Sequence, residues 1–215
     1  MIGELKEKSL HSFLKNFYAP SINQEVKVGP YFADIKNDDE IIEIQTQGFD
    51  KLRDKLDYYL KDYKVRLVYP ISHIKTLIVS DNDLVKTRKS PKVGSIYDAI
   101  KELYKIKSFL GNPNLKLDLV LIDTIEKRVK NNSRKGYLKI ENYPKEIYKI
   151  IKIERVDDYN IFIDDLGEEF TSLNLASKKV SKRNASILLN ILRSIGIIEI
   201  IGKNGRAYLY RRKHV

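Results

Sequence analysis

The sequence predicts an α/β protein: a mixed central sheet flanked by helices, followed by a small, strongly basic domain. The first observation is that helical spacing of apolar residues alternates with short β-branched runs through residues 4–124. The second is the charge distribution. Ten of the 38 residues at 178–215 are Lys or Arg and one is acidic, so this stretch carries +9 of the chain's net charge of +11. We therefore expect the C-terminal part to bind a polyanion.

Composition excludes several classes of protein. The chain has 215 residues, 42% hydrophobic and 10% aromatic, which is ordinary for a folded protein of one or two domains. It contains no cysteine, so disulfides, thiolate zinc sites and thiol nucleophiles are absent. The N-terminus alternates charges where a signal peptide has an apolar core, and the most apolar stretch, residues 187–201, is interrupted by polar residues. We expect a cytoplasmic protein with no membrane partner.

The first predicted elements are a helix and two strands. The helix covers residues 4–18, where Leu10 and Phe17 belong to a series of apolar side chains spaced three and four positions apart. The strands cover residues 24–35 and 41–46, and the polar run between them favours a turn. These elements would begin the central sheet.

Further elements alternate in type along the chain. Apolar residues at helical spacing predict a second and a third helix over residues 49–63 and 95–109. Apolar, β-branched runs predict strands over residues 65–71, 75–80 and 117–124. Together with the first elements, this order predicts one sheet with helices beside it.

Two basic segments are predicted to be irregular. Residues 88–94 read as a basic turn that could follow a phosphate backbone or be a solvated loop, and residues 130–136 read as a basic loop. A strand-rich segment follows over residues 137–153. The pattern then changes, which predicts a first domain at residues 1–153 and a second at residues 154–215.

The second domain is predicted to contain three short helices and a hairpin. Thr171 or Ser172 is a candidate cap for the second helix, and Ser181 is a candidate cap for the third. Asn204-Gly205 between two apolar runs is a strong hairpin signal. Three helices followed by a hairpin resemble a winged helix-turn-helix domain.

This resemblance implies DNA binding, because the third helix of such a domain enters the major groove while phosphate contacts hold its register. The side chains expected at the DNA are Lys178, Lys179, Lys182, Arg183, Ser186, Lys203, Arg206, Arg211 and Arg212. A solvated basic face or a protein–protein connector is the alternative. Charge alone does not separate DNA from RNA, so RNA stays an alternative partner.

A second candidate site is acidic and lies near the N-terminus. Asp34 falls near the end of a predicted strand, and Glu43 and Gln45 point to one side of the next strand because strand side chains alternate. Isoleucines flank Glu43, and a charge in an apolar strand needs a partner. Paired carboxylates suit Mg²⁺ or Mn²⁺, which prefer oxygen ligands. Glu7, at the rim of the first helix's apolar face, is a candidate third carboxylate. The solvent face of an ordinary amphipathic strand is the alternative interpretation.

An acid on the first helix, Asp at a strand end and Glu-x-Gln on the next strand resemble the PD-(D/E)xK nuclease superfamily, which includes type II restriction endonucleases and repair nucleases. The similarity covers residues 4–71. It implies a restriction-endonuclease-like fold and a nuclease that uses one or two divalent ions. In that case Asp34 and Glu43 would be metal ligands, the carbonyl of Ile44 a further ligand, and Glu7 an outer or second ligand.

The sequence departs from the family signature at Gln45, where the family has Lys. Gln can position a water by hydrogen bonding but cannot act as a base. Lys15, Lys36 and Lys64 are candidates for the missing ammonium, and their spacing does not select among them. His11 is a candidate proton shuttle or, more simply, a hydrogen-bond partner of a nearby acid.

Three functions follow from these patterns. The first is a Mg²⁺-dependent DNA endonuclease, docked by its basic C-terminal domain, with Glu7, Asp34, Glu43 and Gln45 as catalytic residues. A homodimer is expected if it cuts both strands concertedly. The second is a non-catalytic DNA-binding regulator or accessory protein with a degenerate nuclease-like core, which Gln45 favours. An RNA-processing factor is a third reading.

Overall fold

The computed structural model describes all residues except 1, 20, 82–83, 132–135, 177–179 and 214–215, and describes only the backbone of residues 2–9 and 21. It divides into two compact units, each discontinuous in sequence. Unit 1 comprises Met1–Thr46, Leu67–Ser95 and Asp118–Ile151, and unit 2 comprises Gln47–Arg66, Ile96–Leu117 and Lys152–Val215. The chain passes from unit 1 to unit 2 after Ile151, close to the predicted domain boundary. The cut between residues 153 and 154 stays a prediction.

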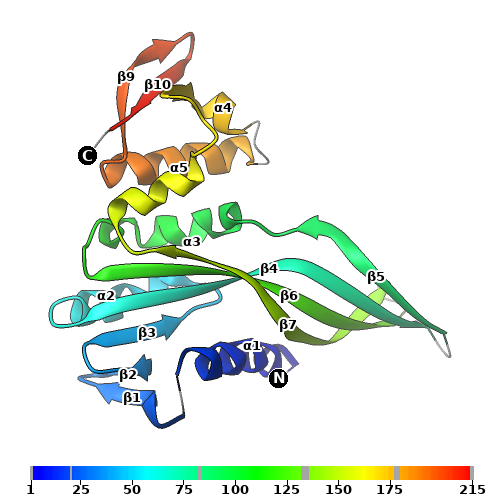
Figure 1. Cartoon of the computed structure of the whole chain (residues 1–215). Coiled ribbons are helices and arrows are strands. Elements are labelled where there is room, and N and C mark those ends of the chain that lie inside the picture. Colours follow the sequence, from blue (N-terminus) through cyan, green and yellow to red (C-terminus); the bar gives the residue numbers. More distant parts are fainter. Residues whose placement is uncertain (1, 20, 82–83, 132–135, 177–179, 214–215) are drawn as a thin grey trace. The chain divides into compact units, whose positions relative to one another are not determined.

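The described chain is a mixed α/β structure with a seven-stranded sheet (Figure 1). Its strands are β1 (Gln24–Val28), β2 (Tyr31–Lys36), β3 (Glu40–Ile44), β4 (Lys64–Asp81), β5 (Leu84–Val93), β6 (Leu115–Lys130) and β7 (Tyr137–Ile153). The order is β1-β2-β3-β4-β6-β7, and β5 also pairs with β4. The predicted α/β class is thereby confirmed, while the restriction-endonuclease-like arrangement stays a prediction.

Two predictions gave the wrong number of strands. The segment over residues 24–35 is a hairpin of β1 and β2, which turns at Gly29 with φ of 59°, a conformation that glycine adopts without a Cβ clash. The segments at 65–71 and 75–80 belong to the single long strand β4. The spacing of apolar residues does not reveal a turn that a glycine makes inside a segment with strand-like spacing.

The prediction of a basic turn at residues 88–94 was also wrong, because most of this segment belongs to β5. The strand pairs with β4 in antiparallel register, with a shift between Ile74 and Thr76. Pro91 lies beside that shift. Proline is tolerated in an edge strand because its missing N–H is not needed by a neighbour. In the described part of the chain, β5 pairs with β4 alone.

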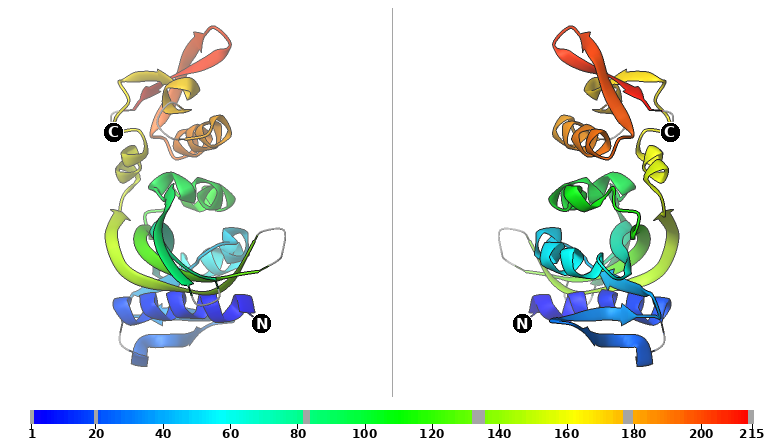
Figure 2. Two further views of the ribbon diagram at one scale, coloured as in Figure 1. Left: turned by 90° about the vertical axis from the view of Figure 1, so that its right-hand side faces the viewer. Right: turned by 90° about the vertical axis from the view of Figure 1, so that its left-hand side faces the viewer.

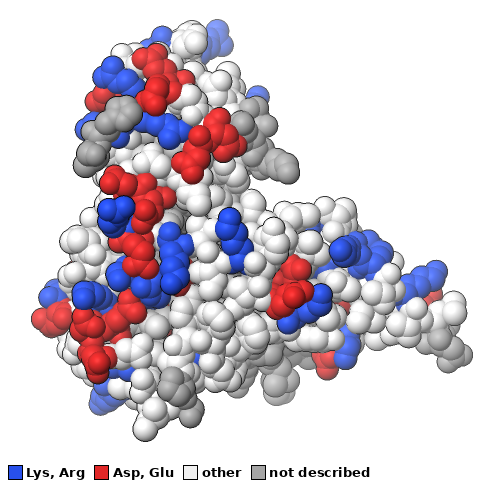
Figure 3. Space-filling view, viewed as in Figure 1, with Lys and Arg blue, Asp and Glu red and all other residues white. Residues whose placement is uncertain are grey.

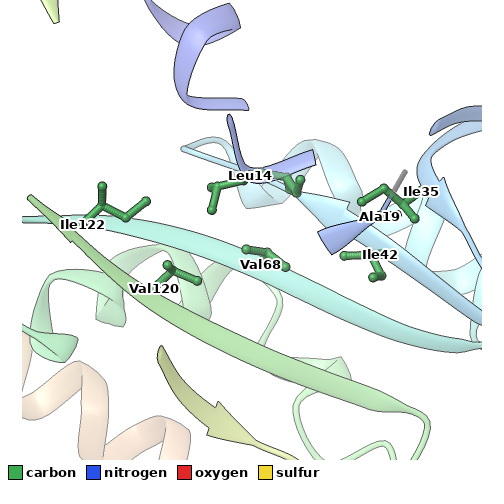
Figure 4. Close-up of a cluster of buried hydrophobic side chains, with 8 residues drawn as sticks. Leu14, Ala19, Ile35, Ile42, Val68, Val120 and Ile122 are labelled. Carbon is green, nitrogen blue, oxygen red and sulfur yellow. The ribbon is translucent and has the colours of Figure 1, made fainter. Parts of the chain in front are cut away.

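The core of unit 1 lies between α1 (Ile2–Tyr18) and the sheet (Figure 2). Figure 4 shows Leu14 of α1 among sheet side chains that include Ile35, Ile42 and Val68. Each of these four is at most 3% exposed. Burial of one such side chain is worth about 1.5–3 kcal/mol, so the contact fixes α1 against the sheet.

In unit 2, the predicted helices at 49–63 and 95–109 are present but shorter and partly 3₁₀. They are η2 (Phe49–Leu52) with α2 (Arg53–Tyr59), and η3 (Ile96–Ala99), α3 (Ile100–Lys105) and η4 (Lys107–Phe109). The Phe49 amide donates to the Glu102 carboxylate at 2.9 Å, which joins η2 to α3.

The C-terminal part of unit 2 contains further helices and a three-stranded sheet of order β8-β10-β9. The elements are η5 (Val156–Phe162), β8 (Glu169–Thr171), α4 (Ser172–Ala176), α5 (Lys182–Ser194), β9 (Ile198–Asn204) and β10 (Ala207–Arg212). The Ser181 side chain accepts from the Asn184 amide at 3.2 Å, which confirms the predicted cap of α5. Gly205, with φ of 61°, lies at the β9–β10 turn.

No helix in the described ranges is both long and apolar enough to cross a bilayer.

Candidate functional site

The two acids predicted as metal ligands lie on adjacent strands of unit 1. The antiparallel β2–β3 ladder pairs Ile35 with Ile42. One position further in the same register, Asp34 of β2 and Glu43 of β3 stand opposite each other. Beyond this point the Ile44 amide donates to Asp34 Oδ2 at 2.8 Å. The backbone of β3 therefore fixes the Asp34 carboxylate directly.

These two carboxylates differ in their access to solvent. The Asp34 side chain is 16% exposed, whereas Glu43 is 2% exposed. Glu43 also interacts with other groups of the protein. Asp34 is therefore the member of the pair that an external ligand would reach first.

Helix α1 brings two basic side chains to Asp34. His11 Nε2 lies 3.1 Å from Asp34 Oδ2, and Lys15 Nζ lies 3.8 Å from Asp34 Oδ1. His11 and Lys15 are four positions apart and so share one helix face. Leu14, fully buried beside Lys15, anchors this part of the helix on the sheet. The packing of α1 therefore determines where both basic groups lie.

Two opposing effects act on the pKa of the Asp34 carboxyl. Burial raises it, because the charged form is less solvated. The hydrogen bond and charge of His11 lower it, as do the Ile44 amide and the charge of Lys15. The contacts win, and the pKa of Asp34 lies below its ordinary value. The carboxylate is therefore ionised at neutral pH.

Glu25 lies at this site but is absent from the residues that the sequence predicts. It follows Gln24, which pairs with Ile35, and so stands opposite Asp34 in the β1–β2 register. Its carboxylate forms an ion pair with Lys15. Its φ of 55° is rare for a residue with a side chain and costs on the order of 1–3 kcal/mol. Nothing in the local pattern distinguishes Glu25 from a solvent-facing strand residue.

The structure separates the three lysines proposed to replace the missing ammonium. Lys15 lies beside Asp34, and its side chain is 8% exposed. Lys36 Nζ donates to backbone carbonyls of the β2–β3 turn. Lys64 is exposed at the first residue of β4. Lys15 is therefore the one of the three that contacts the candidate site.

Two other predicted residues complete the description. Glu7 lies in α1, but its side chain is outside the described residues. Gln45 follows β3, and its backbone amide donates to the carbonyl of Val68 at 3.0 Å. Among the side chains that the structure describes, no group of three or more His, Asp or Glu is arranged to hold a metal ion. The described donor set is the Asp34–Glu43 pair.

The predicted DNA contacts in α5 lie on its exposed side. Lys182, Arg183 and Ser186 are exposed at the start of the helix, whereas Ala185 and Leu188 are buried. The apolar face therefore packs inward as predicted, and the basic start of α5 is open to a ligand. Lys178 and Lys179 lie outside the described residues.

The predicted contacts in the hairpin differ among themselves. Lys203 and Arg206 are exposed on either side of the β9–β10 turn. Arg211 forms an ion pair of 2.6 Å with Glu199. Arg212 donates to backbone carbonyls of the same unit, including that of Leu166 at 2.8 Å. Arg212 therefore holds the fold of unit 2 together, and Lys203 and Arg206 are the hairpin cations most available to a phosphate.

Comparisons with known proteins reveal a family without an assigned activity. The family described as "Domain of unknown function (DUF8091)" matches residues 8–155. An "Uncharacterized protein" of Treponema pallidum (strain Nichols) is 27% identical over 224 residues, which cover 99% of this chain and 88% of that protein. No solved structure matches the chain. The family match contains Asp34, Glu43 and Lys15, and it ends before α4 and α5.

Proposed function

The chain belongs to the family described as Domain of unknown function (DUF8091), and for this member we propose divalent-metal-dependent hydrolysis of DNA phosphodiester bonds. The proposed enzyme is an endonuclease with a PD-(D/E)xK-like core and a C-terminal winged helix that docks the duplex. One observation carries the proposal. The ionised Asp34 stands opposite Glu43 on adjacent strands, and α1 delivers Lys15 to the same point.

Asp34 and Glu43 are the residues that would hold the metal. Carboxylate oxygens are the ligands that Mg²⁺ and Mn²⁺ take, and the lowered pKa of Asp34 keeps it in the form that binds a cation. Such an ion supplies Lewis-acid stabilisation and a water of lowered pKa. Glu7 on α1 would add a third carboxylate, and Gln45 would orient the attacking water by hydrogen bonding.

Lys15 supports the proposal because it supplies a cation that the sequence motif lacks at Gln45. Its ammonium is largely buried and lies between Glu25 and Asp34. A fixed positive charge in a site of low solvent access stabilises negative charge that develops on a phosphate. We assign Lys15 this electrostatic role, and Gln45 the positioning of water.

The docking role rests on the C-terminal part of unit 2. The order β8, α4, α5, β9 and β10 agrees with a winged helix-turn-helix, in which α5 would be the helix that enters the major groove. The basic start of α5 is exposed, as are Lys203 and Arg206 at the hairpin. These groups would bind phosphates and hold the duplex in register.

A non-catalytic DNA-binding protein is the second candidate, and specific observations favour it. Glu43 is 2% exposed, which restricts access for a metal and its substrate. The Asp34 carboxylate already accepts a hydrogen bond from the Ile44 amide. In this alternative, the same contacts would hold a degenerate core together.

DNA cleavage by the purified protein separates the two candidates. Plasmid and single-stranded DNA are incubated in Mg²⁺ or Mn²⁺ with the wild type and with an Asp34→Ala/Glu43→Ala variant. An Asp38→Ala/Asp39→Ala variant removes two carboxylates from the adjoining turn and is the matched control. We expect cleavage by the wild type and the control, lost in the site variant and in chelator. DNA binding without cleavage by any of the three would establish the non-catalytic alternative.

A further inference from the structure

The strand β5 and its neighbours carry a basic surface that the proposed function does not use. We call residues 74–81 of β4 and 84–93 of β5, which pair with each other, the β arm. The strand β5 has no acidic residue, and all of its basic residues are exposed. They are Lys86, Arg88, Lys89 and Lys92.

Three of the cations of β5 differ from cations on the neighbouring strands, because they form no ion pair with a described residue. Lys130 of β6, for example, pairs with Asp81 at 2.8 Å. Within the part of the chain that the structure describes, Lys86, Arg88 and Lys89 take part in no ion pair. Unpaired cations exposed on an edge strand are free to bind an external anion.

These cations lie on both faces of β5. In the β4–β5 register, Arg88 stands opposite Leu77 and Lys86 opposite Val79. Because side chains alternate along a strand, Lys86 and Arg88 lie on one face about 7 Å apart, while Lys89 points to the other face. Cations placed close together along an exposed edge strand complement the repeating charge of a nucleic-acid backbone.

A cluster on the adjoining strands extends the positive charge. Glu126 of β6 contacts Lys75 at 3.0 Å, Arg128 at 2.6 Å and Lys139 at 3.1 Å. Three cations surround one carboxylate, so the cluster keeps an excess of positive charge. Lys75 of β4 lies at the register shift between Ile74 and Thr76, next to the regularly paired part that carries Arg88. Figure 3 shows Lys and Arg side chains spread over this part of the sheet.

We propose that the β arm is a second contact surface for the phosphate backbone of duplex DNA, separate from the C-terminal part. This inference rests on the proposed function only for the identity of the ligand, which is DNA. Binding of DNA to the β arm requires no catalytic activity. A membrane surface is less well matched, because interfacial binding needs a continuous apolar face beside the charges. On β5 the exposed apolar side chains lie at the strand ends, at Leu84, Val85 and Val93.

The test measures the salt dependence of binding to a labelled duplex of random sequence. The arm variant is Lys86→Gln/Arg88→Gln/Lys89→Gln. The matched control, Lys27→Gln/Lys51→Gln/Lys101→Gln, removes three exposed lysines elsewhere. The tail variant is Lys182→Gln/Arg183→Gln/Lys203→Gln/Arg206→Gln. Circular dichroism establishes that each variant is folded.

We expect the arm variant to lower the slope of log affinity against log salt by about 2.7, since each phosphate contact contributes about 0.9. Between 50 and 200 mM salt, the wild type would then lose about forty-fold more affinity than the arm variant. The control should retain the wild-type slope. The tail variant should lower the slope separately, so that combining the two sets lowers it further.

The possible outcomes separate the arm contact from the docking role and from membrane binding. An arm variant with the wild-type slope refutes the arm contact, and loss of binding in the tail variant alone leaves only the docking role standing. Loss in the arm variant alone upholds the arm and refutes the docking role. If the arm substitutions abolish binding to phosphatidylserine vesicles but leave duplex binding unchanged, the surface binds membranes. Absence of cleavage bears on the catalytic proposal alone.

Discussion

The Asp34 carboxylate is contacted by His11 and Lys15 of α1 and by the Ile44 amide of β3, and the charge of Lys15 is buried. Its side chain is 8% exposed and lies between Glu25 and Asp34. Glu25, which forms the ion pair with Lys15, has a left-handed backbone conformation. A strained residue at a charged site is the kind of observation from which a functional role is inferred.

Replacing Lys15 with Gln should therefore affect cleavage more than folding. We expect a loss of about 1 kcal/mol in the free energy of unfolding, because the partner Glu25 is largely solvated. The cleavage rate should fall by about 100-fold or more, because a preorganised positive charge is lost. Lys36→Gln is the control, since Lys36 binds turn carbonyls instead of the site. Single-turnover cleavage beside urea denaturation measures both effects, and equal rates for the two variants would refute the role of Lys15.

The sequence indicates Asp34 and Glu43 because the relevant signals are local: strand alternation, a polar turn and isoleucines around one acid. It does not select Lys15 over Lys36 or Lys64, since that choice depends on how α1 packs on the sheet. Glu25 has no local signal at all, because its role follows from the β1–β2 register.

Among the elements, the Glu126 cluster joins the β arm to β6 and β7. Burial raises the pKa of the Glu126 carboxyl, but hydrogen bonds from Lys75, Arg128 and Lys139 lower it to about 2. The folded pKa lies below the ordinary 4.5, so the charged carboxylate stabilises the fold above pH 4.5. That stability is lost as the pH falls towards 2.

Glu126→Gln should therefore lower the free energy of unfolding at pH 7 by about 3 kcal/mol. The difference from the wild type should shrink as the pH is lowered from 5 to about 2. Urea denaturation across this range measures it. Glu199→Gln is the control, because the Glu199–Arg211 pair is exposed and should have little effect. A difference that stays constant with pH would show that Glu126 does not titrate as inferred.

The helices α1 and α5 are among the elements that the sequence predicts most closely. The apolar face of α5 and its Ser181 cap follow from residues one to four positions apart. Strands are less well predicted, because β4 joins two predicted strands and β5 replaces a predicted turn. The charges and Pro91 of β5 are typical of a loop, and only pairing with β4 makes the segment a strand.

At the scale of the whole molecule, the C-terminal basic part does not form a unit of its own. α5 belongs with α3 in unit 2, and Lys107 Nζ donates to Asn190 Oδ1 at 2.8 Å. The predicted boundary after residue 153 implies that a deletion of residues 178–215 spares the first domain, but this deletion would remove α5 from its contact with α3. Buried side chains such as Leu103 would then lose part of their packing.

The deletion should therefore lower the melting temperature and broaden the unfolding transition. Neutralising Lys182, Arg183, Lys203 and Arg206 should instead leave the melting temperature close to that of the wild type. It should reduce the salt slope of DNA binding by about 3 to 4. Calorimetry of both proteins measures this difference. A truncated chain that melts as the wild type does would support the predicted boundary after residue 153.

The central claim is that Asp34 and Glu43 together bind a divalent cation. Electron paramagnetic resonance of Mn²⁺ tests this claim without DNA or catalysis. The signal of free Mn²⁺ decreases as the ion binds to the protein. We predict that the wild type and the Asp38→Ala/Asp39→Ala control reduce the free signal, and that Asp34→Asn does not. An equal free signal for the wild type and Asp34→Asn would contradict the account.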